Sequence, residues 1–229
     1  MQKTGMMNKE IYLFRGTPGE SYADFTNWMK NTAQSVAETR DVDQVRLVWT
    51  AEAPPSWSII PFRKQKAATL SVVKEDEHPV AFLLSQSGFA GAYRVAEALP
   101  VKYEKSWPDG EPTAGPCLLT LFNRKKGLDT AAFLNRWHNS HTPLSLKIHP
   151  LWNYNRNVVE HPLTKMSEPW EGIVEEQTRT DADLLNPFRF FGGPARILKN
   201  MLAVYRDTNA FLDYKGIETY FAREIVIMS

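Results

Sequence analysis

The histidines of this chain are gathered in one stretch of the sequence. Four of the five lie within 24 residues of one another, and they are His138, His141, His149 and His161. Histidine has an unperturbed pKa of about 6.5, so it can accept and release a proton near neutral pH. Two of the four stand at the end of a helical pattern that also carries Trp137. The stretch therefore predicts a small pocket for acid and base catalysis.

His141 is the strongest candidate for the catalytic group. The helix expected to carry it starts at the N-cap Asp129 and places Phe133 and Trp137 on the same face. Pro143 is expected to end this helix, because proline disfavours helical geometry at the preceding residue. A helix C-terminus favours the charged imidazole and an aromatic pocket favours the neutral one, a balance that suits a general acid or base. The alternative is a core or capping histidine.

The next expected strand, residues 152–159, carries polar side chains at alternate positions. Tyr154 and Arg156 share one of its faces, since side chains in a strand repeat with a period of two. A phenol and a guanidinium that point into a pocket could orient a phenolic, carbonyl or carboxylate group. On a surface, Arg156 would be an ordinary charge. Asn155 alternates with them and has a further asparagine two positions away on each side. Asn is depleted in strands, so these three side chains are expected to have a specific role, as hydrogen-bond partners of either loops or a ligand.

Other residues are weighed as helpers in this site. His138 would assist His141 or only pack its helix. Glu175 lies within an apolar strand, where burial would raise its pKa and let it shuttle protons; facing solvent, it would have no role. Substrate contacts are expected from four more side chains: Trp137, Asn155, His161 and Phe188. Phe188 belongs to an aromatic segment flanked by Pro and Gly, which would be either a lid over an apolar pocket or a plug for a barrel end.

A metal site is the alternative use of these histidines. His138 and His141 form a feasible pair of ligands, and His161 and Glu175 could complete it. The spaced-ligand signature of zinc sites is missing, and nothing resembles a dinucleotide or phosphate loop. The expectation is a site with no metal and no cofactor.

Composition narrows the class of protein. Of 229 residues, 43% are hydrophobic and 12% aromatic, enough to bury a substantial core. The 27 basic and 26 acidic residues give a net charge of +1, without the basic excess typical of nucleic-acid binding. The single cysteine, Cys117, excludes an internal disulfide and fits a reducing cytosol. Residues 1–10 lack the apolar core of a secretory signal and no run is long enough to span a membrane. We expect a cytoplasmic protein with neither nucleic-acid nor membrane partners.

The two halves of the sequence follow a similar order of elements. In each half a short apolar strand leads to a capped helix, at Ser21 and Asp129, and then to a second strand. A third strand, a second helix and a last strand are expected to follow. The first half places its elements at 11–15, 21–36, 45–49, 68–73, 91–98 and 101–107. The second half places them at 117–122, 129–142, 152–159, 172–178, 195–207 and 218–228.

This order, β-α-β-β-α-β, predicts an α+β protein made of two ferredoxin-like repeats. The Pro- and Gly-rich segment 107–116 is the expected linker between residues 1–110 and residues 117–229. One such repeat covers only one face of its sheet with helices, so the other face needs a partner. Two fused repeats would supply each other, sheet against sheet, as a barrel with helices outside. The barrel interior is the expected pocket, and a homodimer could form on top of this.

The run from Phe133 through Trp137 and His141 to Pro143 resembles the signature of the EthD family, within the dimeric α/β-barrel superfamily. The resemblance continues through residues 154–159, 170–175 and 207–213, and so covers about half of the chain, residues 117–229. Members are often two-chain barrels, and this chain resembles a fused, single-chain version. The first half has Phe25, Trp28, Asn31 and Thr32 in place of the histidine pattern, which indicates a degenerate copy.

The resemblance implies a cofactor-independent isomerase, cyclase, lyase or monooxygenase acting on lactones, polyketides or aromatic catabolites; other branches of the superfamily bind haem. An isomerase relative matches at His141 and Tyr154. We therefore expect a lyase or isomerase acting on a small apolar, aromatic catabolite. His141 would transfer the proton, Tyr154 and Arg156 would hold an oxygen, and Glu175 or His138 would assist. The alternatives are a cofactor-free monooxygenase and a non-catalytic binding protein for a hydrophobic metabolite.

Overall fold

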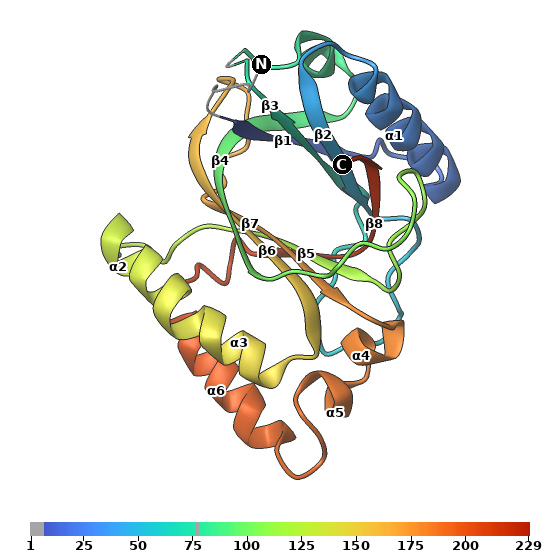
Figure 1. Cartoon of the computed structure of the whole chain (residues 1–229). Helices are drawn as coiled ribbons and strands as arrows, with labels where there is room; N and C mark the ends of the chain where they lie inside the picture. Colours follow the sequence, from blue (N-terminus) through green and yellow to red (C-terminus); the bar gives the residue numbers. More distant parts are fainter. Residues whose placement is uncertain (1–6, 77) are drawn as a thin grey trace.

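A computed structural model describes residues 7–76 and 78–229; residues 1–6 of the segment considered as a secretory signal lie outside this range. Within the described residues, eight strands form a closed antiparallel barrel in the order β1-β3-β2-β8-β5-β7-β6-β4 (Figure 1). The strands are β1 (Asn8–Arg15), β2 (Val42–Trp49), β3 (Ala67–Lys74), β4 (Phe89–Val101), β5 (Cys117–Phe122), β6 (Leu151–Pro162), β7 (Gly172–Thr178) and β8 (Glu218–Met228). The α-helices are α1 (Tyr22–Ala37), α2 (Thr130–Arg136), α3 (Thr142–Ile148), α4 (Asp181–Leu185), α5 (Pro187–Phe190) and α6 (Ile197–Asn209). A 3₁₀ turn, η1 (Ala81–Ser85), and a π-helical turn, η2 (Trp137–His141), complete the order.

Each half of the chain supplies four neighbouring strands of the barrel. The first half is ordered β4-β1-β3-β2 and the second β6-β7-β5-β8, so that in both halves the first and third strands are central. The barrel closes where β2 pairs with β8 and β4 pairs with β6. The segment 102–116 joins the halves and lies outside the strands, apart from an isolated bridge between Pro112 and Ile225.

Local sequence signals explain most of these elements. Ser21 and Asp129 cap their helices as expected, each accepting a hydrogen bond from a backbone N–H three residues later. The expected helix at 91–98 is wrong, because this segment lies within β4, and residues 102–107 form no strand. The segment pairs with β1 on one side and β6 on the other, so tertiary pairing overrides the helix-forming alanines and glutamate in it.

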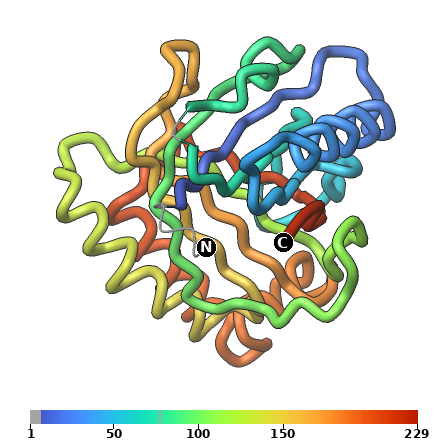
Figure 2. Tube along the Cα trace, turned by 45° about the horizontal axis from the view of Figure 1, so that its top comes forward, coloured from blue at the N-terminus to red at the C-terminus, as the bar shows by residue number. Residues whose placement is uncertain are grey.

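Helices cover the barrel on two opposite sides, with α1 on one side and α2, α3 and α6 on the other (Figures 1 and 2). Under α1 the space is filled by packed side chains: Phe14, Phe25, Met29 and the partly buried Trp28. Phe14 and Trp28 pack edge to face, with ring centroids 5.5 Å apart. The strands of the first half and α1 therefore share a packed apolar core.

Pro143 does not end the histidine-bearing helix, contrary to the expectation from sequence. The chain passes from α2 through the wide turn η2 directly into α3, where Pro143 stands in the first turn. Proline is tolerated there because the first N–H groups of a helix need no partner within it. Both the backbone N–H and the hydroxyl of Thr142 bond the carbonyl of Trp137. Such π-helical turns are frequent at functional sites, and this one contains His141.

The barrel interior is polar at one end. Asn153, Asn155 and Asn157 of β6 are buried, and two of them bond within the barrel. Asn153 donates to the Gln177 side chain at 2.5 Å, and Asn157 accepts from Lys9 at 2.8 Å. The alternating asparagines thus serve the barrel interior. Among the described residues, no helix has the length and apolar character needed to cross a membrane.

Candidate active site

The candidate site is an apolar cavity outside the barrel, between the second-half sheet and the helices that cover it. Its volume is about 230 Å³. Its walls come from β5, β6 and β7, from η2, α3 and α6, and from the aromatic segment at Phe190 and Phe191. The expectation that the barrel interior forms this pocket is therefore wrong. Strand side chains alternate between two faces, and those of Tyr154 and Glu176 point outward to the helices.

His141 stands at the end of the π-helical turn and is held by two neighbours. Its Nδ1 lies 2.9 Å from Oδ2 of Asp207 on α6, and its Nε2 lies 3.2 Å from the hydroxyl of Ser145, one turn further along. Burial raises the pKa of Asp207, but hydrogen bonds from His141 and Ser140 outweigh this effect and keep the pKa below its ordinary value. An ionised Asp207 accepts the Nδ1 proton, so the neutral imidazole presents Nε2 as a base.

Glu176 is the carboxylic acid of this cavity. Burial raises its pKa to about 7, and the charge of His141 only partly opposes this. A carboxyl group with such a pKa exists in both protonation states near neutral pH, which is the condition for proton transfer in either direction. The cavity therefore contains two groups able to carry a proton, Glu176 and His141.

Tyr154 lies on β6 beside Glu176 and is almost fully buried. Burial, and next the charge of Glu176, raise the pKa of Tyr154 well above its ordinary value, so the phenol keeps its proton. Its oxygen accepts a hydrogen bond of 3.4 Å from the indole of Trp137, which also lines the cavity. The hydroxyl proton of Tyr154 is thus suited to donate to an oxygen of a bound molecule.

Glu175, the carboxylate selected from the sequence, points to the other face of the sheet. It is fully buried inside the barrel, where it accepts hydrogen bonds from Arg46 at 2.6 Å and from Thr69 at 3.0 Å. The sequence identified the right strand and the wrong face, since neighbouring strand residues point in opposite directions. Glu175 is a buried partner of Arg46 and lies outside the candidate site.

His138 and Arg156 lie beside the site without lining its cavity. Arg156 shares the outward face of β6 with Tyr154, as expected, but it donates to the Thr142 hydroxyl at 2.9 Å and lies over the Trp137 ring. Burial, and then the charge of Arg156, lower the pKa of His138. Its ring lies against Trp137, at 5.5 Å between centroids. Both residues pack around Trp137.

Three expected substrate contacts are not brought to the cavity. Asn155 is inside the barrel near Glu97, whose pKa it helps to lower. His161 is exposed at the end of β6, and Phe188 is 49% exposed on α5. The aromatic segment does contribute through its other rings, because Phe190 and Phe191 form a wall of the cavity. It does not plug a barrel end.

Several residues of the site were not selected in the sequence analysis. No sequence pattern linked Asp207 to the histidines. Ser145 could have been found, because a residue four positions after His141 lies on the same helix face. His149 was not selected as a site residue from the sequence, yet it lines the cavity and donates from Nδ1 to the Phe190 carbonyl at 2.9 Å. Burial lowers its pKa to about 4. The first half contributes residues 59–61 from the loop between β2 and β3. Only tertiary structure brings that loop here.

The ionisable and hydrogen-bonding groups His141, Tyr154 and Glu176 line the same apolar cavity. Asp207 orients His141, while Tyr154 and Glu176 stand on the neighbouring strands β6 and β7. Within the described residues, no three His, Cys, Asp or Glu side chains gather as a possible metal site. Convergent polar groups of this kind favour catalysis over simple carriage of a hydrophobic molecule.

No family model and no curated protein sequence matches this chain. Solved structures share its fold, and two of them are the following. A candidate monooxygenase from Fusobacterium nucleatum subsp. nucleatum aligns with a TM-score of 0.52 and 11% identity, over 98% of this chain and 94% of its own. An anthrone oxidase-like protein aligns with a TM-score of 0.60 and 8% identity, over 96% of this chain and 91% of its own. The fold they share with this chain is of the α+β class, which in this chain contains a closed antiparallel barrel of eight strands. Membership of the EthD family is not shown by these likenesses, which concern the fold alone.

Proposed function

We propose that this protein is an enzyme that moves protons on a small, apolar, ring-containing substrate bound in the cavity at His141. The observation that carries the proposal is the convergence of the His141–Asp207 pair and Glu176 on one apolar space. Deprotonating a carbon or phenol acid needs a base whose conjugate acid is stabilised, and Asp207 supplies that stabilisation to His141. An apolar cavity of about 230 Å³ suits a small aromatic molecule.

Cofactor-free oxygenation is the reaction we favour. His141 takes a proton from an activated CH₂ group of the substrate, and Tyr154 donates a hydrogen bond to the oxygen on which negative charge develops. Dioxygen then forms a bond to this carbon, and a proton from Glu176 completes a hydroperoxide. Loss of the second carbon-bound proton breaks the O–O bond and yields a ketone and water, so that one oxygen atom enters each product. The names of the two structural neighbours, monooxygenase and anthrone oxidase-like, support this choice.

A lyase or isomerase reaction is the second candidate. It is favoured by the presence of two proton-carrying groups in one cavity, because an isomerase removes a proton at one atom and returns it at another. His141 would remove the proton and Glu176 would return it. Both candidates share the first step, the removal of a proton from carbon, and differ in whether dioxygen is consumed.

The proposal also includes the repeat organisation and the family of this chain. The shared strand order of the two halves supports a fusion of two ferredoxin-like repeats, divided in the segment 102–116, with the site in the second. The first half has only the 3₁₀ turn η1 between its third and fourth strands, in keeping with a degenerate copy. Membership of the EthD family, a small-molecule substrate and assembly as a homodimer are parts of this proposal.

The proposal is tested with a panel of anthrones, phenols and unsaturated lactones in D₂O without oxygen. We expect the protein to catalyse exchange of deuterium into at least one compound, detected by mass spectrometry, because proton abstraction precedes any use of dioxygen. Admitting ¹⁸O₂ then separates the candidates: uptake of one labelled atom supports oxygenation, and a rearranged product without label supports isomerisation. Absence of both exchange and turnover across the panel would contradict the proposed function.

Tyr154→Phe is expected to lower kcat about tenfold, less than the loss of His141. The substitution removes one hydrogen bond to the developing oxyanion and keeps the ring that packs against Trp137. KM should change little, because the bond strengthens mainly in the transition state. Steady-state kinetics with the active compound of the panel measures both constants. An unchanged kcat would show that Tyr154 does not contact the reacting oxygen.

A further inference from the structure

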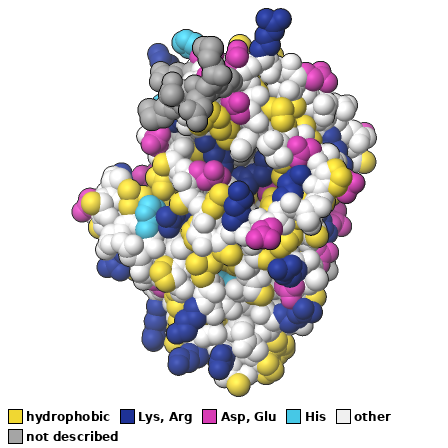
Figure 3. All heavy atoms as spheres, in the orientation of Figure 1, with side chains coloured by type: hydrophobic (Ala, Val, Ile, Leu, Met, Phe, Trp, Pro, Cys, Tyr) yellow, Lys and Arg dark blue, Asp and Glu magenta, His cyan; other side chains and the backbone are white. Residues whose placement is uncertain are grey.

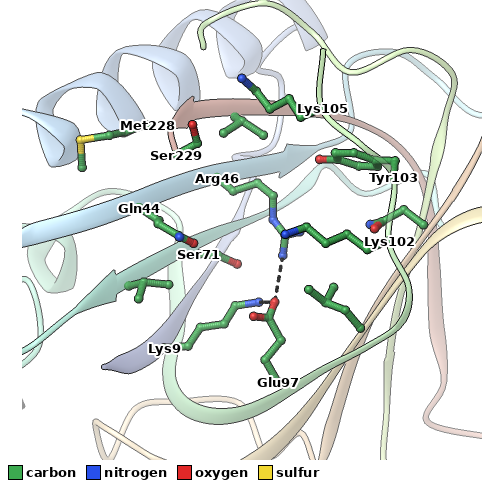
Figure 4. Close-up of a pocket in the computed structure, with 14 residues that line it drawn as sticks. Lys9, Gln44, Arg46, Ser71, Glu97, Lys102, Tyr103, Lys105, Met228 and Ser229 are labelled. Carbon is green, nitrogen blue, oxygen red and sulfur yellow. Dashed lines mark hydrogen bonds and ion pairs between the residues drawn. The ribbon is translucent and has the colours of Figure 1, made fainter. Parts of the chain in front are cut away.

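A second cavity opens at one end of the barrel, on the opposite face of the sheet from the candidate active site. Its volume is about 300 Å³. In the space-filling view the surface is hollowed at the barrel end, and basic and acidic side chains gather in the hollow (Figure 3). Arg46, Lys9 and Glu97 lie at its centre, with Ser71, Lys102 and Tyr103 around them (Figure 4). None of these residues takes part in the chemistry proposed for His141.

The acidic groups around this cavity are already bonded. Glu97 accepts from Lys9 at 2.5 Å, and Glu175, behind Arg46, accepts from Arg46 and Thr69. Glu224, also behind Arg46, accepts from a further set of donors: Tyr103 at 2.7 Å, Thr113 at 2.8 Å and Gln177 at 2.5 Å. A ligand whose polar groups are all hydrogen-bond donors would therefore meet carboxylate oxygens that already accept hydrogen bonds from the protein.

Donor groups, by contrast, remain available to a ligand. The Ser71 hydroxyl is buried and has no hydrogen-bond partner among the described residues, although it lines the cavity. Lys102 is exposed at the mouth, close to the Arg46 side chain (Figure 4). Burial, and next the charge of Arg46, lower the pKa of Lys9 to about 8, which leaves this amine mainly protonated at neutral pH. Of the four basic residues that line the cavity, Lys9, Arg46 and Lys105 are already paired with carboxylates. Among the described residues, Lys102 and the Ser71 hydroxyl are therefore the donors left to a ligand, with the Arg46 guanidinium beside them.

The remaining part of the cavity wall is apolar. Val73, Leu99, Val226 and Met228 line it. An inorganic anion would leave these side chains without contacts, whereas a short hydrocarbon chain or ring would cover them and be removed from water. A carboxylate offers acceptors only, which complements the spare donors.

We propose that the barrel mouth is a second binding site, for a small organic carboxylate. Its carboxylate group lies among Ser71, Arg46 and Lys102, and its hydrocarbon part lies against the apolar wall. The site is separate from the cavity at His141, because the two open on opposite faces of the β6–β7 sheet. Occupation of one therefore does not require occupation of the other.

Isothermal titration calorimetry with hexanoate tests this site, with hexanamide and inorganic phosphate as the comparison ligands. Saturable binding of hexanoate, tighter than that of either comparison ligand, is the expected result. Ser71→Ala should weaken the binding about tenfold, since it removes a hydrogen bond to a charged group. Lys102→Ala should weaken it about two- to fivefold, the usual effect of one exposed charge. Both side chains can be shortened without leaving a buried charge unpaired.

Two control variants assign the binding to the barrel mouth. Lys126→Ala, a surface change in the turn after β5, should leave hexanoate binding as it is. His141→Ala should do the same if the ligand avoids the outer cavity. The proposal is overturned if hexanoate fails to bind, if hexanamide or phosphate binds as tightly, or if His141→Ala rather than Ser71→Ala removes the binding. Circular dichroism of each variant establishes that its fold is intact.

Discussion

Replacing His141 by alanine is expected to lower kcat about 10²- to 10⁴-fold while the chain stays folded. The imidazole is the group that would take the proton from carbon, and no neighbouring side chain reaches the same position with Asp207 behind it. Its loss also leaves Asp207 without its partner, but both side chains are 15% exposed, so water can solvate the remaining carboxylate. Kinetics with the active compound, together with thermal unfolding of the variant, measures both parts of this expectation.

The matched control is His161→Ala, which removes an exposed imidazole at the far end of β6. Its kcat should equal that of the unchanged protein. A His141→Ala variant with full activity would exclude His141 as the base. Equal losses in both variants would show that the assay responds to something other than proton transfer at this cavity.

Glu176→Gln is expected to lower kcat about 10²-fold and to change the pH profile of the reaction. Because burial holds the pKa of Glu176 at about 7, the balance between its acid and its base form shifts around neutral pH. An enzyme that needs the protonated form to complete the hydroperoxide loses activity as the pH rises through about 7. In the glutamine variant this falling limb should be absent.

The same substitution should raise stability at high pH. A raised carboxyl pKa means that the folded chain holds the proton more tightly than the unfolded chain. In the unfolded chain the carboxyl pKa of Glu176 has its ordinary value of 4.5. The contribution of protonated Glu176 to the free energy of unfolding is therefore complete below pH 4.5. It is lost as the pH rises to about 7, at a slope of about 1.4 kcal/mol per pH unit. Glutamine has no such titration, so Glu176→Gln should unfold at higher denaturant concentration than the unchanged protein at pH 8. Equal midpoints at pH 8 would indicate an ordinary, solvated Glu176.

Glu175→Gln is the matched comparison on the same strand. Its carboxylate is bonded to Arg46 inside the barrel, and replacing it leaves the guanidinium buried without that charge. It should therefore destabilise the protein, the opposite sign to Glu176→Gln. Two neighbouring residues with opposite effects on stability would establish which face of β7 each occupies.

The sequence by itself determined the elements whose signals are local. The caps at Ser21 and Asp129 and the strands around Cys117, Tyr154 and Glu218 follow from hydrogen-bonding side chains and apolar runs. His141 and Tyr154 were also predicted to face one pocket, and they line the same cavity. Spacing on a helix and period on a strand suffice for these inferences, because both depend on residues close in sequence.

Only the tertiary structure decided which side of the barrel is used and which partners complete the site. Glu176 rather than Glu175 faces the cavity, because a strand pattern gives two faces and pairing with β5 and β6 decides which one is covered by helices. Asp207 reaches His141 from a helix that starts more than fifty residues later in the chain, and the loop at Ile60 arrives from the other half. The segment at Tyr93 forms a strand because it pairs with β1 on one side and β6 on the other, which closes the barrel. Contacts between distant segments are set by the packing of the whole chain, and no local pattern of residues encodes them.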